Sequence, residues 1–175
     1  MKKNIVIIAL AFLSLQSYAQ TKKNNLMIGG NIGYSSTKTS SLNVKNTTLN
    51  ISPTVGYFVG DNLAVGVNLN YSQEKFASIT QSLFSFGPFA RYYFGEHDKL
   101  KPFGQIGLGL FSGNHQVNFN NTKITGSSYH IGLGTAYFLT KNVALEGMLQ
   151  YQKTNPKEGS NSNILALKIG FQIHL

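Results

Sequence analysis

The chain has 175 residues with 18 glycines, no cysteine and no tryptophan, and its formal charge is +9. Charged residues make up 12% of the sequence, about half the share that is usual in soluble domains. The length fits one domain, and the absence of cysteine excludes a disulfide scaffold, a thiolate metal site and a cysteine nucleophile. A large porin is also excluded, because 16 strands of about 10 residues need roughly 160 strand residues and leave no room for connections.

The first residues have the pattern of a secretory signal peptide. Two lysines precede an apolar run over residues 5–13, and a small-x-small ending follows. The run is too short for a membrane anchor, because a spanning helix needs about 20 apolar residues. We predict cleavage between Ala19 and Gln20, which divides the chain into a signal peptide (residues 1–19) and one mature domain (residues 20–175). No cysteine follows the cleavage site, so a lipoprotein anchor is excluded.

From residue 26 onward, large apolar residues alternate with small or polar ones in eight successive segments. Alternation at period two over this length predicts β-strands and excludes helices. Four-residue connections alternate with longer ones of about 7 to 14 residues. This pattern predicts an all-β fold, an eight-stranded antiparallel up-and-down transmembrane β-barrel with short turns at one end and long loops at the other. The predicted strands are Leu26–Ser36, Thr47–Phe58, Leu63–Glu74, Ser82–Phe94, Lys101–Gly113, Ser127–Phe138, Val143–Lys153 and Asn163–Leu175.

The two faces of these strands distinguish a membrane barrel from a soluble ligand-binding barrel. In the last strand, Leu167 and Ile169 share an apolar face, and the opposite face is small or polar. Small side chains suit the narrow interior of an eight-stranded barrel, so we expect the apolar face to contact lipid. Arg91, Glu146 and Lys168 support this orientation because all three fall on the small or polar face. A lysine or arginine on the lipid face would cost about 2–4 kcal/mol at mid-membrane.

Four tyrosines are placed as in the aromatic girdles of membrane barrels. Tyr57 and Tyr137 lie beside short turns, and Tyr71 and Tyr151 lie near the opposite ends of the same hairpins. Phenol rings favour the headgroup level of a bilayer, so we predict one girdle at each interface. The alternative is the ordinary enrichment of aromatic residues in strands.

An internal repeat and two further segments suggest a family. Residues 56–66 recur as residues 136–146, and both copies are predicted to form a strand, a four-residue turn and a strand. With residues 87–94 and 101–109, these hairpins resemble the outer-membrane protein β-barrel domain family over residues 26–175. The resemblance implies a porin-like scaffold similar to OmpA- and OmpX-type barrels in a Gram-negative outer membrane, but no particular activity. The signal ending Tyr-Ala-Gln resembles those of Bacteroidota proteins.

The end of the chain carries the most specific motif. Its polar-x-Gly-x-x-apolar-x-apolar pattern resembles the signal by which the barrel assembly machinery recognises the final strand of its substrates. Family members more often end in phenylalanine, and the terminal leucine departs from that pattern. We expect this machinery to be a partner during insertion; the alternative is a routine amphipathic strand. The motif residues are Lys168, Gly170, Phe171, Ile173 and Leu175.

A polar network is predicted inside the barrel. Arg91 and Glu146 lie at similar distances from a short turn, Gln105 is expected beside Arg91, and Lys168 is expected opposite Met148. Charges in a narrow lumen need partners, because an unpaired buried charge costs several kcal/mol. We predict that these side chains plug the lumen, either as a purely structural network or as a switchable gate.

The sequence predicts no catalytic, cofactor or metal site. Ser128 and His130 share a face, but no acidic residue completes a triad with them. The other histidines are dispersed without metal-ligand spacing, and the Ile-Gly-Leu-Gly runs lack the strand-to-helix turn of a phosphate loop. We therefore expect no enzymatic activity, and a lipid-modifying enzyme ranks third among the possible functions.

The long loops are predicted to carry six lysines against two glutamates, Glu74 and Glu158, a net charge of +4. Lipopolysaccharide phosphates are the nearest anions, and each lysine at a membrane surface contributes about 1 kcal/mol. Solvated loops are the alternative, and nucleic acid is excluded as a partner. We expect a monomeric protein with a structural, adhesion or surface-interaction role; the alternative is a narrow channel for ions or small solutes. The six lysines are Lys38, Lys45, Lys75, Lys123, Lys153 and Lys157.

Overall fold

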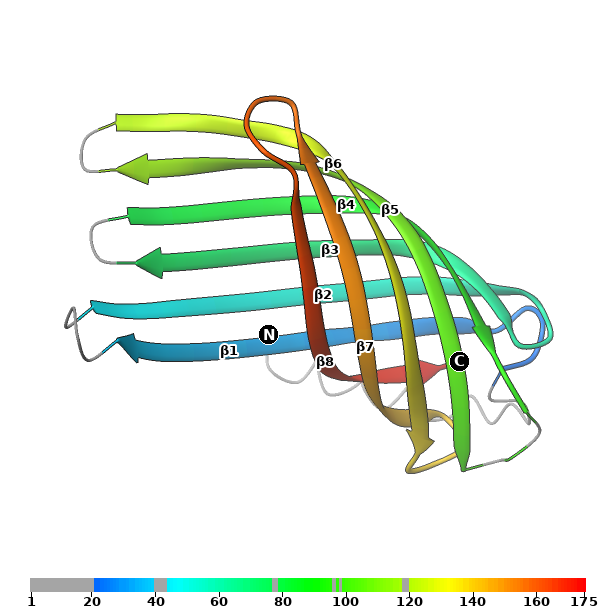
Figure 1. The fold of residues 1–175 in the computed structure, drawn as a ribbon. Helices are drawn as coiled ribbons and strands as arrows, with labels where there is room; N and C mark the ends of the chain where they lie inside the picture. The colour runs from blue at the N-terminus through cyan, green and yellow to red at the C-terminus, as the bar shows by residue number, and fades with distance from the viewer. Residues whose placement is uncertain (1–20, 40–43, 77–78, 96, 98, 118–119) are drawn as a thin grey trace, which may run out of the picture.

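The computed structural model describes residues 21–39, 44–76, 79–95, 97, 99–117 and 120–175, so the predicted cleavage site lies outside the described residues. Eight antiparallel strands form a closed barrel in chain order, which confirms the predicted fold class (Figure 1). No helix among the described residues is long and apolar enough to cross a membrane. The strands are β1 (Leu26–Thr39), β2 (Val44–Gly60), β3 (Leu63–Phe76), β4 (Ile79–Tyr93), β5 (Leu100–Val117), β6 (Asn120–Phe138), β7 (Val143–Pro156) and β8 (Ser162–His174).

The two ends of the barrel differ in their connections. At the turn end, residues 61–62, 94–99 and 139–142 join the strands, and β1 starts and β8 finishes there. We call the opposite end the hairpin end. The strands have 13 to 19 residues, and about 9–11 residues suffice to cross a membrane. Most strands therefore extend beyond the hydrophobic region of a bilayer.

The expectation of long loops at the hairpin end is wrong. The ladder between β5 and β6 continues until Val117 lies opposite Asn120, and that between β3 and β4 continues until Phe76 lies opposite Ile79. The period-two pattern arises where one strand face meets lipid and the other lines the lumen. Beyond the bilayer both faces meet water, so polar residues pair in strands there without producing that pattern.

An apolar belt covers the outward face of the barrel. Its central leucines are among the most exposed large side chains, with Leu133 at 68% and Leu167 at 72%. On β3, β6 and β7 the belt stops at a tyrosine toward the hairpin end, and the next outward position on each of these strands is polar. This exposure confirms that the apolar face points outward, as contact with lipid requires. The boundary tyrosines are Tyr71, Tyr129 and Tyr151, followed outward by Gln73, Ser127 and Lys153.

The four tyrosines predicted to form girdles all lie on the outward face. Tyr57 and Tyr137 lie near the turn end, opposite Leu26 and Leu145 respectively. Tyr71 and Tyr151 lie at the hairpin side of the belt, and all four side chains are exposed. The structure thus places them at two levels, one near each edge of the apolar surface.

The interior is less uniformly small than the sequence pattern suggests. Glycine and short polar residues line the middle of the lumen, but large apolar side chains fill the part toward the turn end. Toward the hairpin end the lining again includes large apolar residues, such as Leu83, Phe111 and Ile124. Large rings fit toward the turn end because neighbouring inward positions are small, such as Ala64, Ala136 and Ala144. The large inward side chains include Met27, Phe58, Phe89, Tyr93, Phe103 and Phe138.

A short N-terminal segment, residues 21–25, lies across the turn end. The backbone N–H of Asn62 donates to the Thr21 carbonyl at 2.7 Å, and Lys101 Nζ donates to Thr21 Oγ1 at 3.0 Å. The backbone N–H of Lys23 donates to the Asp61 carboxylate at 3.0 Å. That hydrogen bond lowers the pKa of Asp61 below its usual value. The segment therefore covers the turn end of the barrel, next to the aromatic interior and outside the membrane.

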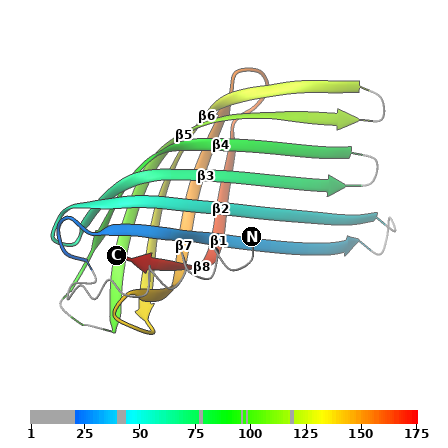
Figure 2. The same cartoon turned by 180° about the vertical axis from the view of Figure 1, so that it is seen from behind.

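The barrel closes where β8 pairs with β1, and this seam is short. It runs from Met27 opposite His174 to Asn31 opposite Gly170, whereas β1 stays paired with β2 as far as Thr39. Beyond the seam, β1 and β8 diverge toward the hairpin end, as seen from both sides of the molecule (Figures 1 and 2).

Candidate functional site in the barrel lumen

An ion pair lies inside the barrel at the level where the aromatic interior begins. Arg91 on β4 and Glu146 on β7 are both buried, and Arg91 Nη1 lies 2.8 Å from each carboxylate oxygen of Glu146. Arg91 Nε donates to Gln105 Oε1 on β5 at 2.9 Å. Gln105 lies directly opposite Arg91 in the β4–β5 register. Three strands thus join in one charged cluster across the lumen.

Tyr93 completes this cluster and was missed in the sequence analysis. Its hydroxyl accepts a hydrogen bond from Arg91 Nη1 at 3.1 Å and donates to Glu146 Oε1 at 3.2 Å. Tyr93 lies two residues beyond Arg91, so period-two alternation already puts it on the same inward face. The Arg91 guanidinium carbon also lies 4.2 Å from the centroid of the Phe103 ring, a cation–π distance.

Aromatic rings form a floor below the ion pair. The Tyr93 ring centroid lies 5.5 Å from that of Phe103 and 5.9 Å from that of Phe58. The His174 ring packs 5.1 Å from Phe138 and 5.6 Å from Phe58. These separations are those of favourable aromatic pairs. The floor and the ion pair together fill the lumen toward the turn end.

Lys168 lies opposite Met148, as predicted, whereas Glu146 lies opposite Gly170. The prediction that Lys168 joins the same plug is wrong, because it makes no hydrogen bond or ion pair with Arg91, Gln105 or Glu146. Two residues along a strand separate these levels by about 7 Å. Among the described residues Lys168 has no hydrogen-bond or ion-pair partner, and it lines the space above the Arg91 cluster.

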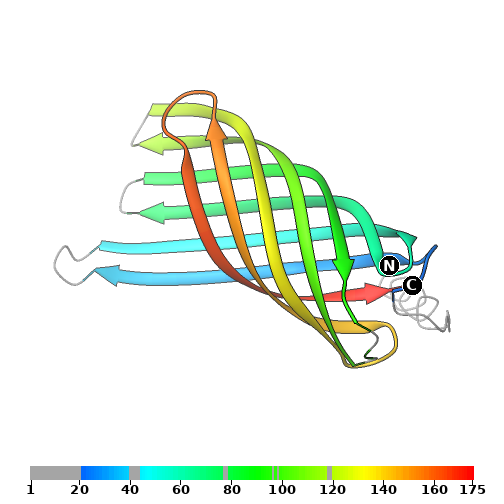
Figure 3. The same cartoon turned by 45° about the vertical axis from the view of Figure 1, so that its right-hand side comes forward.

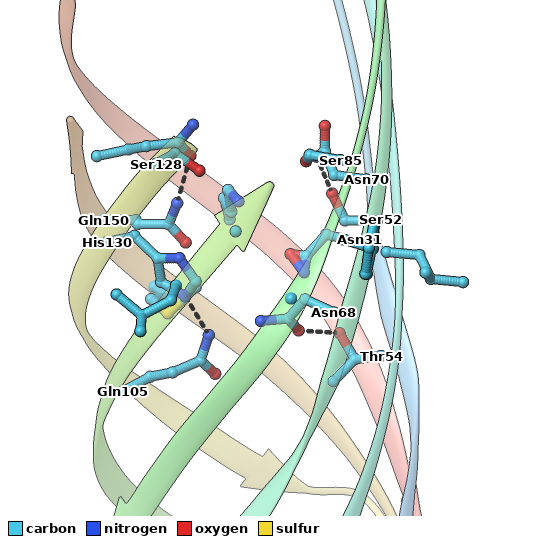
Figure 4. A pocket seen from close by; sticks show the side chains of 18 of the residues that line it. Asn31, Ser52, Thr54, Asn68, Asn70, Ser85, Gln105, Ser128, His130 and Gln150 are labelled. Carbon is cyan, nitrogen blue, oxygen red and sulfur yellow. Dashed lines mark hydrogen bonds between the residues drawn. The ribbon is translucent and has the colours of Figure 1, made fainter. Parts of the chain in front are cut away.

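Two connected spaces lie above the ion pair. The lower, about 50 Å³, has Arg91, Gln105, His130 and Lys168 in its wall. Figure 4 shows its polar lining, with Asn31, Ser52, Thr54, Asn68 and Asn70 on one side and Gln105, Ser128, His130 and Gln150 on the other. The upper, about 790 Å³, continues to the hairpin end and shares several of these residues. The lumen is therefore a cup whose base is the Arg91 cluster. Its lower part is polar, and its upper part is also lined by apolar residues such as Leu83, Phe111 and Ile124.

The remaining candidates for chemistry are placed as follows. His130 Nε2 lies 3.2 Å from Gln105 Nε2, and Ser128 lines the same space. Glu146, the acid at the base of the cup, is held by Arg91. Within the described residues, no cluster of three or more histidine or acidic side chains could hold a metal ion.

The lysines predicted in outer loops lie mostly on strands, because the strands extend further than expected. Lys75, Lys123 and Lys153 belong to β3, β6 and β7, and only Lys157 lies in a connection. Lys38 and Lys45 face each other across the β1–β2 ladder, and their side chains lie outside the described part of the structure.

The motif at the end of the chain lies at the seam. Lys168, Gly170, Phe171 and Ile173 are on β8, and Leu175 follows it. The Leu175 and Leu26 backbones exchange two hydrogen bonds of 2.8 Å. The terminal residues therefore close the barrel, independently of any role in recognition by the assembly machinery.

The sequence identifies the protein family to which the chain belongs. Residues 5–172 match the outer membrane protein beta-barrel domain family. The chain belongs to this family. Membership in the outer membrane protein beta-barrel domain family agrees with the outward apolar belt and makes the chain a small outer-membrane barrel. No curated protein with a similar sequence was found.

Solved structures of other outer-membrane proteins share the fold of this family member. Neisserial surface protein A is 20% identical, with a TM-score of 0.61 over 85% of this chain and 94% of that one. The N-terminal barrel of Pseudomonas aeruginosa OprF is 18% identical, with a TM-score of 0.59 over 87% of this chain and 98% of that one. Ail, the attachment invasion locus protein of Yersinia pestis, is 12% identical, with a TM-score of 0.53 over 87% of this chain and 99% of that one. At these identities the likeness concerns the fold.

Proposed function

We propose that this barrel is a structural and surface-interaction protein of the outer membrane whose lumen does not conduct. The observation that carries the proposal is the buried Arg91–Glu146 pair resting on the aromatic floor. Breaking such a pair is costly, because a charge without its partner would be left in the interior. A path for ions would have to cross both layers, so the role that we propose does not involve conduction through the lumen.

The hairpin end is the surface through which we propose that the protein acts. Its strand extensions carry Lys75 and Lys123, and Lys157 lies in the last connection; all three side chains are exposed. Glu74 and Glu158 lie at the same end, but lysines outnumber them. Phosphates of lipopolysaccharide are the anions nearest to such a surface, and we propose them as its ligands. An attachment role, as the name of Ail implies for that protein, would use the same surface.

Binding to lipid A tests this proposal. The barrel is refolded in uncharged detergent and titrated with liposomes containing lipid A at low and high salt. Replacing Lys75, Lys123 and Lys157 by glutamine should weaken binding about 100-fold at low salt, at about 1 kcal/mol for each lysine. Replacing three exposed lysines of the turn end, Lys23, Lys99 and Lys141, is the matched control and should change little. Equal losses in both triple variants, or binding insensitive to salt, would contradict the proposal.

A narrow channel is the second candidate. The lumenal cup reaches from the hairpin end down to Arg91, so only the ion-pair cluster and the floor separate it from the turn end. If the ion pair opened and the floor moved, the cup would become a pore. We place this candidate second because the floor closes the lumen independently of the ion pair.

A further inference from the structure

The wall of the barrel is open between β1 and β8 toward the hairpin end. Among the described residues, β1 beyond Asn31 pairs only with β2, and β8 before Gly170 pairs only with β7 (Figure 3). Gly30, at the end of the seam, has φ of 151°, and a Cβ there would meet the Ser52 carbonyl oxygen at 2.3 Å. The seam thus ends beside a backbone conformation that favours glycine.

The larger lumenal cavity passes through this opening. The cavity of about 790 Å³ lies against the unpaired stretch of both strands. On β8 it touches Leu167, Lys168 and Ile169. On β1 it touches Asn31 inside and Ile32 outside. Among the described residues, no strand pairing between β1 and β8 separates this part of the cavity from the lipid-facing surface.

The opening lies at membrane depth. Leu167 is opposite Leu149, which is opposite Leu133 in the middle of the apolar belt. Unpaired backbone groups are costly in lipid, because no water satisfies them there. The free edges of β1 and β8 therefore favour an occupant that combines a polar group with an apolar part.

The charge at the bottom of the opening determines which polar group the occupant would carry. Lys168 is the first inward residue of β8 above the seam, and it has no ion-pair partner among the described residues. Arg91 below it is neutralised by Glu146. The acidic residues of the cavity, Glu74 and Glu158, lie toward the hairpin end. A cation thus lies where the lumen meets the membrane, and it favours an anion.

The residues at the rim of the opening determine where the apolar part of the occupant would lie. Ile32, Leu167 and Ile169 flank it and are 70%, 72% and 66% exposed. We propose that a single-chain anionic amphiphile, such as a fatty acid, enters between β1 and β8. Its carboxylate binds Lys168 in the lumen, and its chain lies against the three rim residues. A cavity of this size falls in the range of about 300–1,000 Å³ that holds small ligands. This site is independent of the lipopolysaccharide surface proposed above.

A single tryptophan provides the test, because the chain has none. Ala166→Trp puts the fluorophore on the inward face of β8 in the cavity, and Leu149→Trp puts one on the lipid face as the matched control. Each variant is refolded into phosphatidylcholine vesicles and titrated with three quenchers. These are 11-bromoundecanoate, the same chain with a trimethylammonium head, and dibrominated phosphatidylcholine.

Saturable quenching of the Ala166→Trp fluorescence by bromoundecanoate is expected, and adding Lys168→Met should weaken it about tenfold or more. The cationic chain and the two-chain lipid should quench Ala166→Trp far less than they quench Leu149→Trp. Quenching by all three reagents alike, or unchanged affinity with Lys168→Met, would overturn the proposal. No quenching together with a cross-linked dimer would assign the opening to a second copy and also overturn it. Gln152→Trp, which lines the cavity from β7, replaces Ala166→Trp if that variant does not fold.

Discussion

Arg91 on β4 and Glu146 on β7 are in direct contact at 2.8 Å, although 55 residues separate them in the sequence. They lie across the lumen, on strands that are not neighbours in the barrel. The contact therefore exists only when the barrel has closed with the correct register. The same contact therefore depends on closure of the barrel and blocks the lumen.

Removing one partner of the pair should destabilise the barrel strongly. Glu146→Gln leaves the Arg91 charge buried without its counter-ion, and the expected loss is about 3–5 kcal/mol in the free energy of unfolding. Urea unfolding of the refolded barrel measures it. Glu158→Gln, at an exposed position in the β7–β8 connection, is the control and should change stability by less than about 0.5 kcal/mol.

A double variant separates the charge from the packing. In Arg91→Met with Glu146→Met, no charge is left unpaired, so the double variant should be more stable than Glu146→Gln alone. A double variant that is less stable than the single one would contradict the view that the unpaired charge dominates the loss.

The aromatic floor should contribute to stability in the manner of a protein core. Phe103 is 1% exposed, and Phe103→Ala is expected to cost about 3–5 kcal/mol because it leaves a cavity beneath Arg91. Phe86→Ala, at a lipid-facing position that is 49% exposed, should cost much less because lipid fills the space. The two free energies of unfolding are compared in the same vesicles, and equal losses would count against a packed floor.

Lysine substitutions on β7 test which face meets lipid. Leu149→Lys puts a charge in the middle of the apolar belt and should cost about 2–4 kcal/mol. Gln152→Lys puts the same charge in the lumenal cup, which opens at the hairpin end, and should cost less than about 1 kcal/mol. Unfolding in phosphatidylcholine vesicles distinguishes them. A larger loss of stability in Gln152→Lys than in Leu149→Lys would contradict this orientation, because it is expected of a barrel with an apolar interior.

Removing residues 171–175 should prevent closure of the barrel. These residues supply most of the β8 side of the seam, including the backbone pair between Leu175 and Leu26. Folding is followed by the change of electrophoretic mobility on heating, in vesicles and in cells. The substitution Leu175→Phe keeps the seam and restores the more frequent terminal residue, so it should assemble at least as well as the wild type. A truncated chain that still shows the heat-dependent shift would refute both the structural and the recognition role.

Much of the fold could be predicted from the sequence, because lipid contact imposes alternation along each strand. The starts of β3 at Leu63 and of β7 at Val143, and the end of β6 at Phe138, agree with prediction because the turns interrupt the pattern there. The hairpin ends could not be predicted. Their strands leave the bilayer, and the pairing of Lys38 with Lys45 has no signature in hydrophobicity.

The lumenal site could be predicted only in part. Depth along the strands indicated that Arg91, Gln105 and Glu146 share a level, because a short turn fixes each register. Lys168 lies opposite Met148, as predicted. The register alone does not give the contacts of its side chain, so the sequence did not show that Lys168 stays apart from the Arg91–Glu146 pair. The short β1–β8 seam could not be predicted at all, since alternation continues through both strands beyond the point where they separate.

Single-channel recording in planar bilayers tests the central claim that the ion pair and the aromatic floor close the lumen. The wild-type barrel and the Glu146→Ala variant are compared at equal protein density. Because the floor remains in place when the ion pair is broken, neither protein is predicted to show steady unitary openings. Regular openings of the wild type, or their appearance in Glu146→Ala, would contradict a closed lumen and favour a gated channel.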